Sequence, residues 1–281
     1  MRERRTKKTI VSPTKLVAGV TIVLFVTVAA SFTKAQDTRN LTPVQAAIER
    51  EQERLKSSDD EERRDALMRL GAMHRPAASR VALPLLNDPS PIVRVTATKA
   101  ILSLDPEESA AALLPLLNDK DEFVRREAAY ALGLTRSRSA TTSLTDRLLN
   151  DKDAGVRGAA AVALGRIGDE NAVIALASTL APQLSAPAKS KRKAEANEFV
   201  LRAAAVALGQ IKNRAGTPAL ISALNNEKFP QDVRREAARS LGLIGDPAAI
   251  PALKSVSTSE DPFLARLAYE SLRKLSHGST P

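Results

Sequence analysis

Few side chains in this chain of 281 residues could act as a nucleophile, a general base or a metal ligand. Cysteine is absent, which removes thiol nucleophiles, zinc–thiolate sites and disulfides. The histidines are His74 and His277, and a nucleophile–base–orienter triad would need one of them. Both lie in the atypical first and last units of a repeated pattern. We therefore predict no catalytic residue, no metal site and no cofactor.

Arginine side chains recur at a spacing that could bind phosphate groups. They occupy two adjacent positions of the repeat: Arg63, Arg94, Arg125, Arg157 and Arg234 at the first, and Arg64, Arg126, Arg202, Arg235 and Arg266 at the second. Aspartates recur just before them, at Asp59, Asp121, Asp153 and Asp261. Because a paired arginine has little capacity left for a ligand, we interpret both sets as a structural ladder. Each Asp is predicted to cap its helix and to pair with an Arg of the next unit.

A basic run is the second candidate for binding. It lies in residues 181–197, which also contain Pro182 and Pro187, so we predict an exposed loop there. Its basic residues are Lys189, Lys191, Arg192 and Lys193. The sharper hypothesis is that they contact an acidic partner or an anionic membrane surface.

All these residues are positioned by a repeat of 31 to 33 residues. Its anchor positions are Glu62, Val93, Val124, Val156, Val200, Val233 and Leu264, and one interval lengthens to 44 residues across the 181–197 insertion. Ala stands four residues after every anchor and Leu or Ile stands eight after it, which makes one stripe of an α-helix. Gly168 and Gly245 are predicted to end first helices, and the Asp that follows each begins a shorter second helix. The sequence predicts an all-α solenoid of about six helical hairpins and a terminal helix.

Two phrases of the repeat, DEFVRREAAYALG at 121–133 and DAGVRGAAAVALG at 153–165, resemble the HEAT-like repeat of phycobilisome bilin lyase subunits. The resemblance covers residues 59–275 and implies an α-α superhelix whose second helices line the inner face. Deoxyhypusine hydroxylase is similar in architecture but holds iron through His–Glu pairs, whereas Arg75 and Gly278 follow the two histidines here. DNA glycosylases of this fold stack the nucleotide on Trp, which is absent. The resemblance therefore indicates the fold rather than the function.

The first 58 residues differ from the repeat. Residues 1–35 have a basic start, an uncharged stretch at 16–33 and small residues before Gln36, the layout of a secretory signal peptide. The alternative is an uncleaved signal anchor, and both predict a repeat domain outside the cytoplasm, periplasmic, extracellular or membrane-anchored. Residues 36–58 are predicted to be a linker and a capping helix that begins with a capping box at Thr42. Residues 59–281 form the predicted HEAT-like domain.

The inner face supplies the functional hypothesis. The residues 22 positions after the anchors are Pro84, Pro115, Asp146, Ser178, Ser222 and Ser255. A nucleic-acid groove would carry Lys and Arg, so this small and nearly uncharged column favours a protein or peptide partner, bound by its last four residues and the basic run. We expect an exported, non-enzymatic scaffold. The alternative is a regulatory or lyase-like subunit acting with a partner chain, and nucleic-acid binding comes third.

Overall fold

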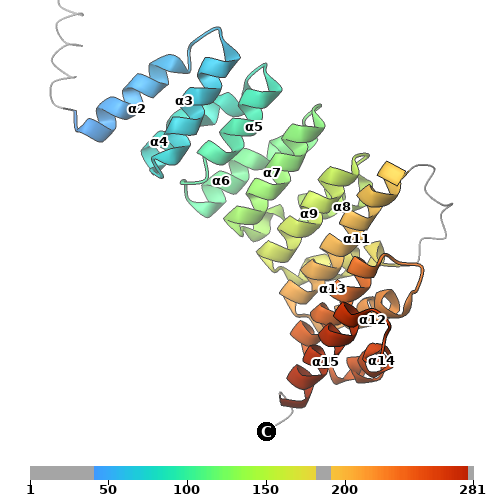
Figure 1. Cartoon of the computed structure of the whole chain (residues 1–281). Coiled ribbons are helices and arrows are strands. Elements are labelled where there is room, and N and C mark those ends of the chain that lie inside the picture. The colour runs from blue at the N-terminus through green and yellow to red at the C-terminus, as the bar shows by residue number, and fades with distance from the viewer. Residues whose placement is uncertain (1–40, 182–190, 278–281) are drawn as a thin grey trace, which may run out of the picture. The chain divides into compact units, whose positions relative to one another are not determined.

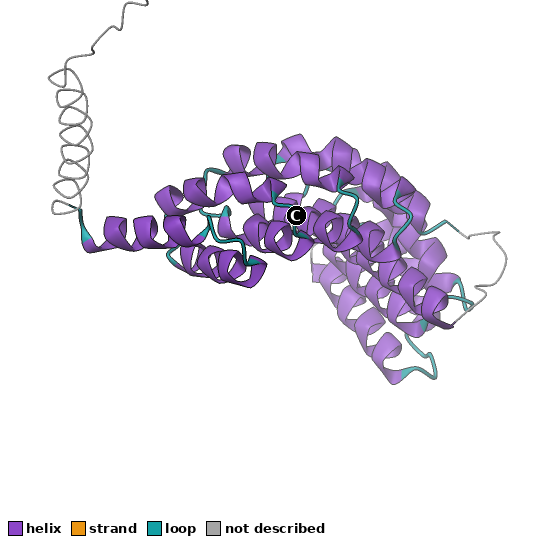
Figure 2. Cartoon of the chain, turned by 90° about the horizontal axis from the view of Figure 1, so that it is seen from above, coloured by secondary structure: helices purple, strands orange, loops and turns teal. Residues whose placement is uncertain are grey.

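The computed structural model of the chain describes residues 41–181 and 191–277, and within the second range it describes side chains from Glu198 to Ser276. The chain divides into two compact units, Met1–Arg50 and Glu51–Pro281. Every regular element among the described residues is a helix (Figure 2). None of these helices combines the length and the apolar character that a membrane crossing requires.

Helix α2 (Pro43–Arg54) begins in the first unit with the predicted capping box. The backbone N–H of Thr42 donates to Gln45 Oε1 at 2.9 Å, and the backbone N–H of Gln45 donates to Thr42 Oγ1 at 3.3 Å. Pro43 occupies the first helical position, where its missing N–H leaves no carbonyl unpaired. The predicted helix start is confirmed.

The second unit contains six helical hairpins and a terminal helix. Their first helices are α3 (Asp60–Ala72), α5 (Pro91–Ala100), α7 (Glu122–Thr135), α9 (Ala154–Ile167), α11 (Lys191–Ile211) and α13 (Gln231–Ile244), followed by the terminal α15 (Pro262–His277). Their second helices are α4 (Pro76–Ala82) with η2 (Leu83–Asn87), α6 (Pro106–Leu113) with η3 (Leu114–Asn118), η4 (Arg138–Ala140) with α8 (Thr141–Asn150), η5 (Glu170–Ala172) with α10 (Val173–Thr179), η6 (Arg214–Gly216) with α12 (Thr217–Asn225) and η7 (Pro247–Ala249) with α14 (Ile250–Val256). Successive first helices pack side by side (Figure 1), which confirms the predicted all-α solenoid.

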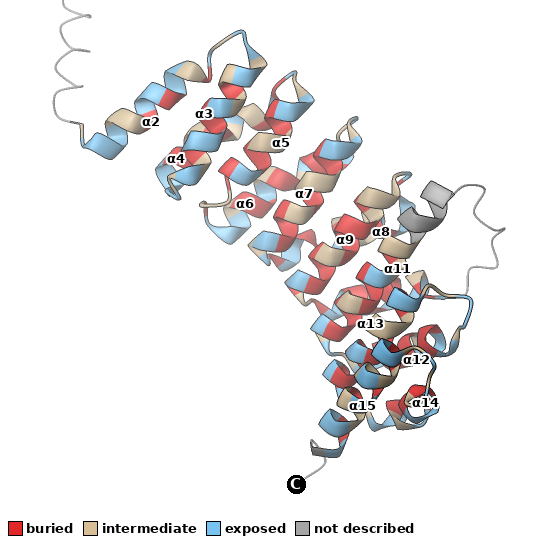
Figure 3. Ribbon diagram, viewed as in Figure 1, coloured by how far each residue is buried: buried red, intermediate tan, exposed pale blue. Residues whose placement is uncertain are grey.

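The predicted apolar stripe is the core of this unit. The Ala four residues after each anchor is 0% exposed in all seven first helices, and the Leu or Ile eight after it is at most 1% exposed in the first six. Figure 3 shows buried segments recurring along these packed helices. In α15 the corresponding Leu272 is only half-buried, since no further helix covers it among the described residues. Burial of this repeated stripe joins each repeat to its neighbours.

Glycine lets neighbouring first helices approach closely. A Cβ added at Gly133 would lie 2.7 Å from Ala163 Cα of the next helix, and one at Gly209 would lie 2.4 Å from Ser240 Oγ. These glycines stand nine residues after an anchor, and each faces the small residue seven after the next anchor. Only a glycine leaves room for that contact.

Two other glycines end their helices as predicted. Gly168 and Gly245 have φ values of +73° and +74°, in the left-handed region that favours glycine. Asp169 then accepts a hydrogen bond from the backbone N–H of Asn171, which begins the next helical turn. The predicted helix stops and starts are confirmed.

The 181–197 insertion is only partly a loop. Helix α11 begins at Lys191, so the predicted loop is wrong for residues 191–197. The stretch KRKAEAN has no Gly or Pro and consists mostly of good helix formers, so it extends the helix that follows. Lys191, Arg192 and Lys193 therefore stand in the first turn of α11, and Lys189 lies outside the described residues.

Candidate functional site

Three arginines form a buried ladder with aspartates at the ends of second helices. In each pair two guanidinium nitrogens donate to both carboxylate oxygens over 2.7 to 3.0 Å; the pairs are Arg63–Asp88, Arg94–Asp119 and Arg125–Asp151. The remaining nitrogen, Nη1, reaches back to a backbone carbonyl, which for Arg94 is that of Asp88 at 2.8 Å. Asp88 thus binds the arginine of one repeat through its carboxylate and that of the next through its carbonyl. The ladder links consecutive repeats.

The capping aspartates differ from the prediction in their pairing with arginine. Asp121 accepts hydrogen bonds from the backbone N–H groups of Phe123 and Val124, so it does cap its helix. The partner of Arg94 is Asp119, two residues before the cap. The predicted ladder exists, but its predicted pairing is wrong, because the carboxylate of a cap is turned toward the amides of its own helix. Where a cap does bind an arginine, Asp261 pairs with Arg235 of the preceding repeat.

The ladder carboxyls are held in their charged form. Burial alone would raise the pKa of Asp88, Asp119 and Asp151. Hydrogen bonds from their arginines and from a backbone N–H lower the pKa by more than burial raises it, so each pKa lies below its usual value. The hydrogen bonds that Arg63 and Arg125 donate to Asp88 and Asp151 in turn raise the pKa of these arginines. These guanidinium charges are neutralised within the chain, which supports a structural role over phosphate binding.

The predicted column lies on the exposed side of the second helices. We call its six residues the second-helix surface: Pro84, Pro115, Asp146, Ser178, Ser222 and Ser255, all of them exposed. The Asp146 carboxylate accepts hydrogen bonds from Arg147 and from Asn150, and the Arg147 bond chiefly lowers the pKa of Asp146. The hydroxyls of Ser178 and Ser255 donate to carbonyls of their own helices at 2.8 Å. The surface therefore presents little free charge.

Sequence reasoning missed an apolar side chain beside this surface. Ile174, at the start of α10, is 81% exposed. It stands 18 residues after its anchor, where the other hairpins carry Arg80, Ala111, Thr142, Pro218 and Pro251, which are also exposed. A comparison of that column would have found it, since Ile is the large aliphatic residue there.

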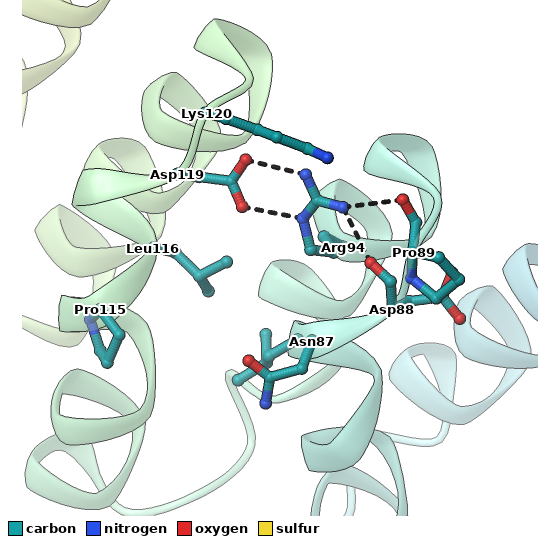
Figure 4. Close-up of a pocket in the computed structure, with 9 residues that line it drawn as sticks. Asn87, Asp88, Pro89, Arg94, Pro115, Leu116, Asp119 and Lys120 are labelled. Atoms are coloured by element: carbon teal, nitrogen blue, oxygen red, sulfur yellow. Dashed lines mark hydrogen bonds and ion pairs between the residues drawn. The ribbon is translucent and has the colours of Figure 1, made fainter.

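Sequence reasoning also missed a cleft between the first two second helices. It has a volume of about 430 Å³. Figure 4 shows the Arg94–Asp119 pair on one side, with Lys120 beside it and Asn87 and Pro115 across the opening. The available signal was the phrase LPLLND, which occurs at 83–88 and again at 114–119.

The two histidines lie at opposite ends of the repeat domain. His74 is exposed in the turn between α3 and α4, and the side chain of His277 lies outside those described. Within the described residues, no group of three or more His, Asp or Glu side chains is placed to hold a metal ion.

Comparison with known proteins gives one curated relative and several similar folds. Deoxyhypusine hydroxylase from Gallus gallus is 35% identical over 94 residues, which is 31% of each chain. Importin beta has a TM-score of 0.63 at 14% identity, over 83% of this chain and 37% of that one. The complex of CpcE and CpcF of phycocyanin lyase from Nostoc has a TM-score of 0.48 at 23% identity, over 86% and 89% of the two chains. Both solved structures are similar in fold alone.

The curated relative corrects the expected function. The prediction of a non-enzymatic scaffold is wrong, because the curated protein that matches this chain is an enzyme. The finding favours the alternative of a regulatory or lyase-like subunit that acts with a partner chain.

The repeats themselves match a known family model. The model for HEAT repeats matches residues 49–133, 111–187 and 189–273. These ranges contain the buried stripe, the glycine contacts and the Arg–Asp ladder, and together they cover most of the chain. The chain belongs to the HEAT repeat family.

Proposed function

We propose that the chain is a regulatory or lyase-like subunit of an enzyme, and that its partner chain lies against the second-helix surface. The observation that carries the proposal is a row of exposed, small and nearly uncharged side chains on six successive second helices. Depletion of charge is typical of the centre of a protein–protein interface. A repeat array distributes such an interface over many modest contacts.

Ile174 supplies an apolar anchor for that partner. Its side chain is 81% exposed in the isolated chain. Burial of an aliphatic side chain of this size contributes about 1.5 to 3 kcal/mol, which a surface of serines and prolines does not provide elsewhere. Leu149, near the end of α8, is a second exposed apolar side chain on the second helices, at 49% exposure.

The relationship to an enzyme motivates the catalytic part of the proposal. The hydroxylase activity belongs to the curated relative, whose matching region is 31% of its length. For this chain we propose that the partner contributes the reacting groups and that the repeats position them. Protein rather than nucleic acid is the proposed partner, because the arginines of the ladder are already paired.

We also propose that the repeat domain is exported. Residues 1–35, the predicted signal peptide or anchor, lie outside the described residues. Intact mass of the exported protein decides between the two forms: a chain that starts at Gln36 supports a cleaved signal. Recovery of the full-length chain from membranes supports the anchor and a membrane-associated subunit.

A capture experiment tests the proposed function. Residues 36–281 serve as bait for an envelope extract, and we expect one stoichiometric protein, with any pigment that copurifies supporting the lyase-like role. Joint replacement of Asp146, Ser178 and Ser222 by Arg should abolish capture while helicity and melting temperature stay nearly unchanged. The matched control places three arginines on exposed first-helix positions, Met68, Leu134 and Leu243.

The control variant should capture the partner normally. If the surface variant also does so, while deletion of residues 189–193 abolishes capture, the second-helix surface is not the interface. The basic run, with Lys189, Lys191, Arg192 and Lys193, would then be the binding site.

A further inference from the structure

The cleft between η2 and η3 combines apolar walls with a polar rim (Figure 4). Leu86 and Leu116 line it from consecutive repeats, and Pro115 is exposed at its edge. A volume of about 430 Å³ falls within the range of ligand pockets, roughly 300 to 1,000 Å³. The cleft is large enough for a short segment of another chain.

The cleft follows from two copies of one local structure. Both LPLLND segments leave the α-helix at their first Leu and continue as 3₁₀ turns, η2 and η3. A 3₁₀ turn is tighter than an α-helix, so its side chains point in different directions. In the next repeat α8 stays α-helical through the corresponding residues up to Asn150. Space therefore opens between the first two second helices.

The buried charges of the cleft are already satisfied. Arg94 binds both oxygens of Asp119 at 2.8 Å and donates to the carbonyls of Asp88 and Pro89. The Asp88 carboxylate is bound by Arg63. A ligand therefore cannot compete well for these groups.

Two polar side chains at the rim remain available to bind a ligand. Lys120 is exposed, and its ammonium, which lies beside the Arg94 guanidinium (Figure 4), forms no hydrogen bond or ion pair with the described residues, while its backbone carbonyl accepts from Arg125 Nη1. Asn87 is exposed across the opening and makes no side-chain hydrogen bond to the part of the chain that is described. Together they offer one cation, one amide donor and one amide acceptor.

We propose that this cleft binds an extended segment of a protein partner in which a leucine stands next to an acidic residue. The leucine side chain packs against the exposed edges of Leu86 and Leu116, each 6% exposed, the carboxylate pairs with Lys120, and the Asn87 amide binds the backbone of the segment. The assignment of the segment to the partner chain rests on the proposed function; the binding chemistry does not.

Titration of the full-length chain with synthetic peptides tests this chemistry. The probe is acetyl-Gly-Leu-Glu-Leu-Gly-amide, and the comparison peptides replace Glu by Gln or both leucines by Ala. Methyl NMR signals of Leu86 and Leu116 should shift with the Glu peptide at concentrations up to roughly 5 mM and saturate. Both comparison peptides should bind about tenfold more weakly, because each loses the ion pair or the apolar contact.

Variants at the rim locate the carboxylate. Lys120→Gln should weaken binding of the Glu peptide about tenfold. Lys152→Gln is the matched control, since Lys152 follows Asp151 as Lys120 follows Asp119 but does not line the cleft. It should leave binding unchanged. Lys120→Glu should prefer the peptide with Lys in place of Glu, and circular dichroism checks that each variant is folded.

Several outcomes would overturn the inference. They are no methyl shift with the Glu peptide, equal binding of the Glu and Gln peptides, or an equal effect of the two lysine variants. Inorganic phosphate that shifts the same methyls as strongly as the peptide would show a site for small anions instead. The peptide titration needs no partner protein, so the two experiments are independent. Lack of peptide binding would not affect the interpretation of the capture experiment, and lack of capture would not affect that of the peptide titration.

Discussion

The repeats before the 181–197 insertion and those after it share one buried stripe but are joined differently. Before the insertion, bidentate Arg–Asp pairs such as Arg125–Asp151 link consecutive hairpins. After it, the hydroxyls of Ser240 and Ser271 donate to carbonyls of the preceding first helix, at 2.8 and 2.9 Å. Each serine faces a glycine of that helix at the close contact. The same buried stripe is thus combined with two kinds of polar contact between repeats.

The insertion falls where the buried ladder ends. Arg157 still reaches back to the Asp151 carbonyl at 2.8 Å, as the earlier arginines do. An aspartate 25 or 26 residues later would continue the series, but the sequence has Pro182 and Gln183 there. After the insertion, Leu201 replaces the arginine altogether. The regular polar joint and the regular repeat length are lost together.

Loss of one ladder arginine should give the largest effect on stability. Arg125→Met would leave the Asp151 carboxylate, 2% exposed, without its bidentate partner, with Arg147 Nη1 at 3.6 Å as a more distant cation. Removal of one member of a buried pair costs about 3 to 5 kcal/mol, and chemical denaturation measures it. The corresponding change after the insertion, Arg235→Met, should cost much less, because Arg235 is 28% exposed.

The double variant Arg125→Met, Asp151→Asn controls for lost packing. It removes both charges, so it should be more stable than Arg125→Met alone. A double variant that is no more stable would mean that the arginine acts through its aliphatic stem and its carbonyl contacts.

The second largest effect concerns acid, which should destabilise the repeats before the insertion more than those after it. Burial raises the pKa of Asp88, Asp119 and Asp151, but the arginine and backbone hydrogen bonds lower it by a larger amount. The folded-state pKa of each therefore lies below the unfolded value of about 3.9. Their stabilisation is therefore complete above that value and is lost as pH falls through the lower folded-state pKa. Among the side chains described after the insertion there is one such pair, Arg235–Asp261, in which the arginine is more exposed.

Limited digestion with pepsin at about pH 3 measures the difference, because cleavage reports local opening. We expect cuts within residues 60–151 before cuts within 200–275. The Asp119→Asn variant should reduce that pH dependence. Earlier cleavage of the second region would show that the ladder does not control acid stability.

The sequence was sufficient for the helices because their signals are local. The Ala and Leu stripe, the stops at Gly168 and Gly245 and the capping box at Thr42 each depend on neighbours within one or two turns. The start of α11 was missed because Pro182 and Pro187 suggested a loop that extended over the basic run. Proline ends local order but does not say where the next helix begins.

The candidate site was less accessible to sequence reasoning because it depends on lateral packing. The exposed positions of Asp146 and Ser222 follow from helical periodicity, and they were predicted. The predicted pairing chose the capping aspartates and was wrong for Arg94, because no local signal distinguishes Asp121 from Asp119, its actual partner. The cleft requires two 3₁₀ turns at a particular spacing.

The smallest predicted effect tests the serine joints. Ser240→Ala removes the hydroxyl that donates to the Ala205 carbonyl, and the loss of one such bond costs about 0.5 to 1.5 kcal/mol. The smaller side chain itself should fit, because Ala163 already occupies the equivalent contact against Gly133. Chemical denaturation measures the change in the free energy of unfolding.

The reverse substitution, Ala163→Ser, should be tolerated within about 0.5 kcal/mol, because its hydroxyl can reach the carbonyl of Ala129 as Ser240 reaches that of Ala205. A cost above about 3 kcal/mol for either change would show that the two joints are not interchangeable. The ladder and the serines would then belong to two distinct packing geometries rather than to one.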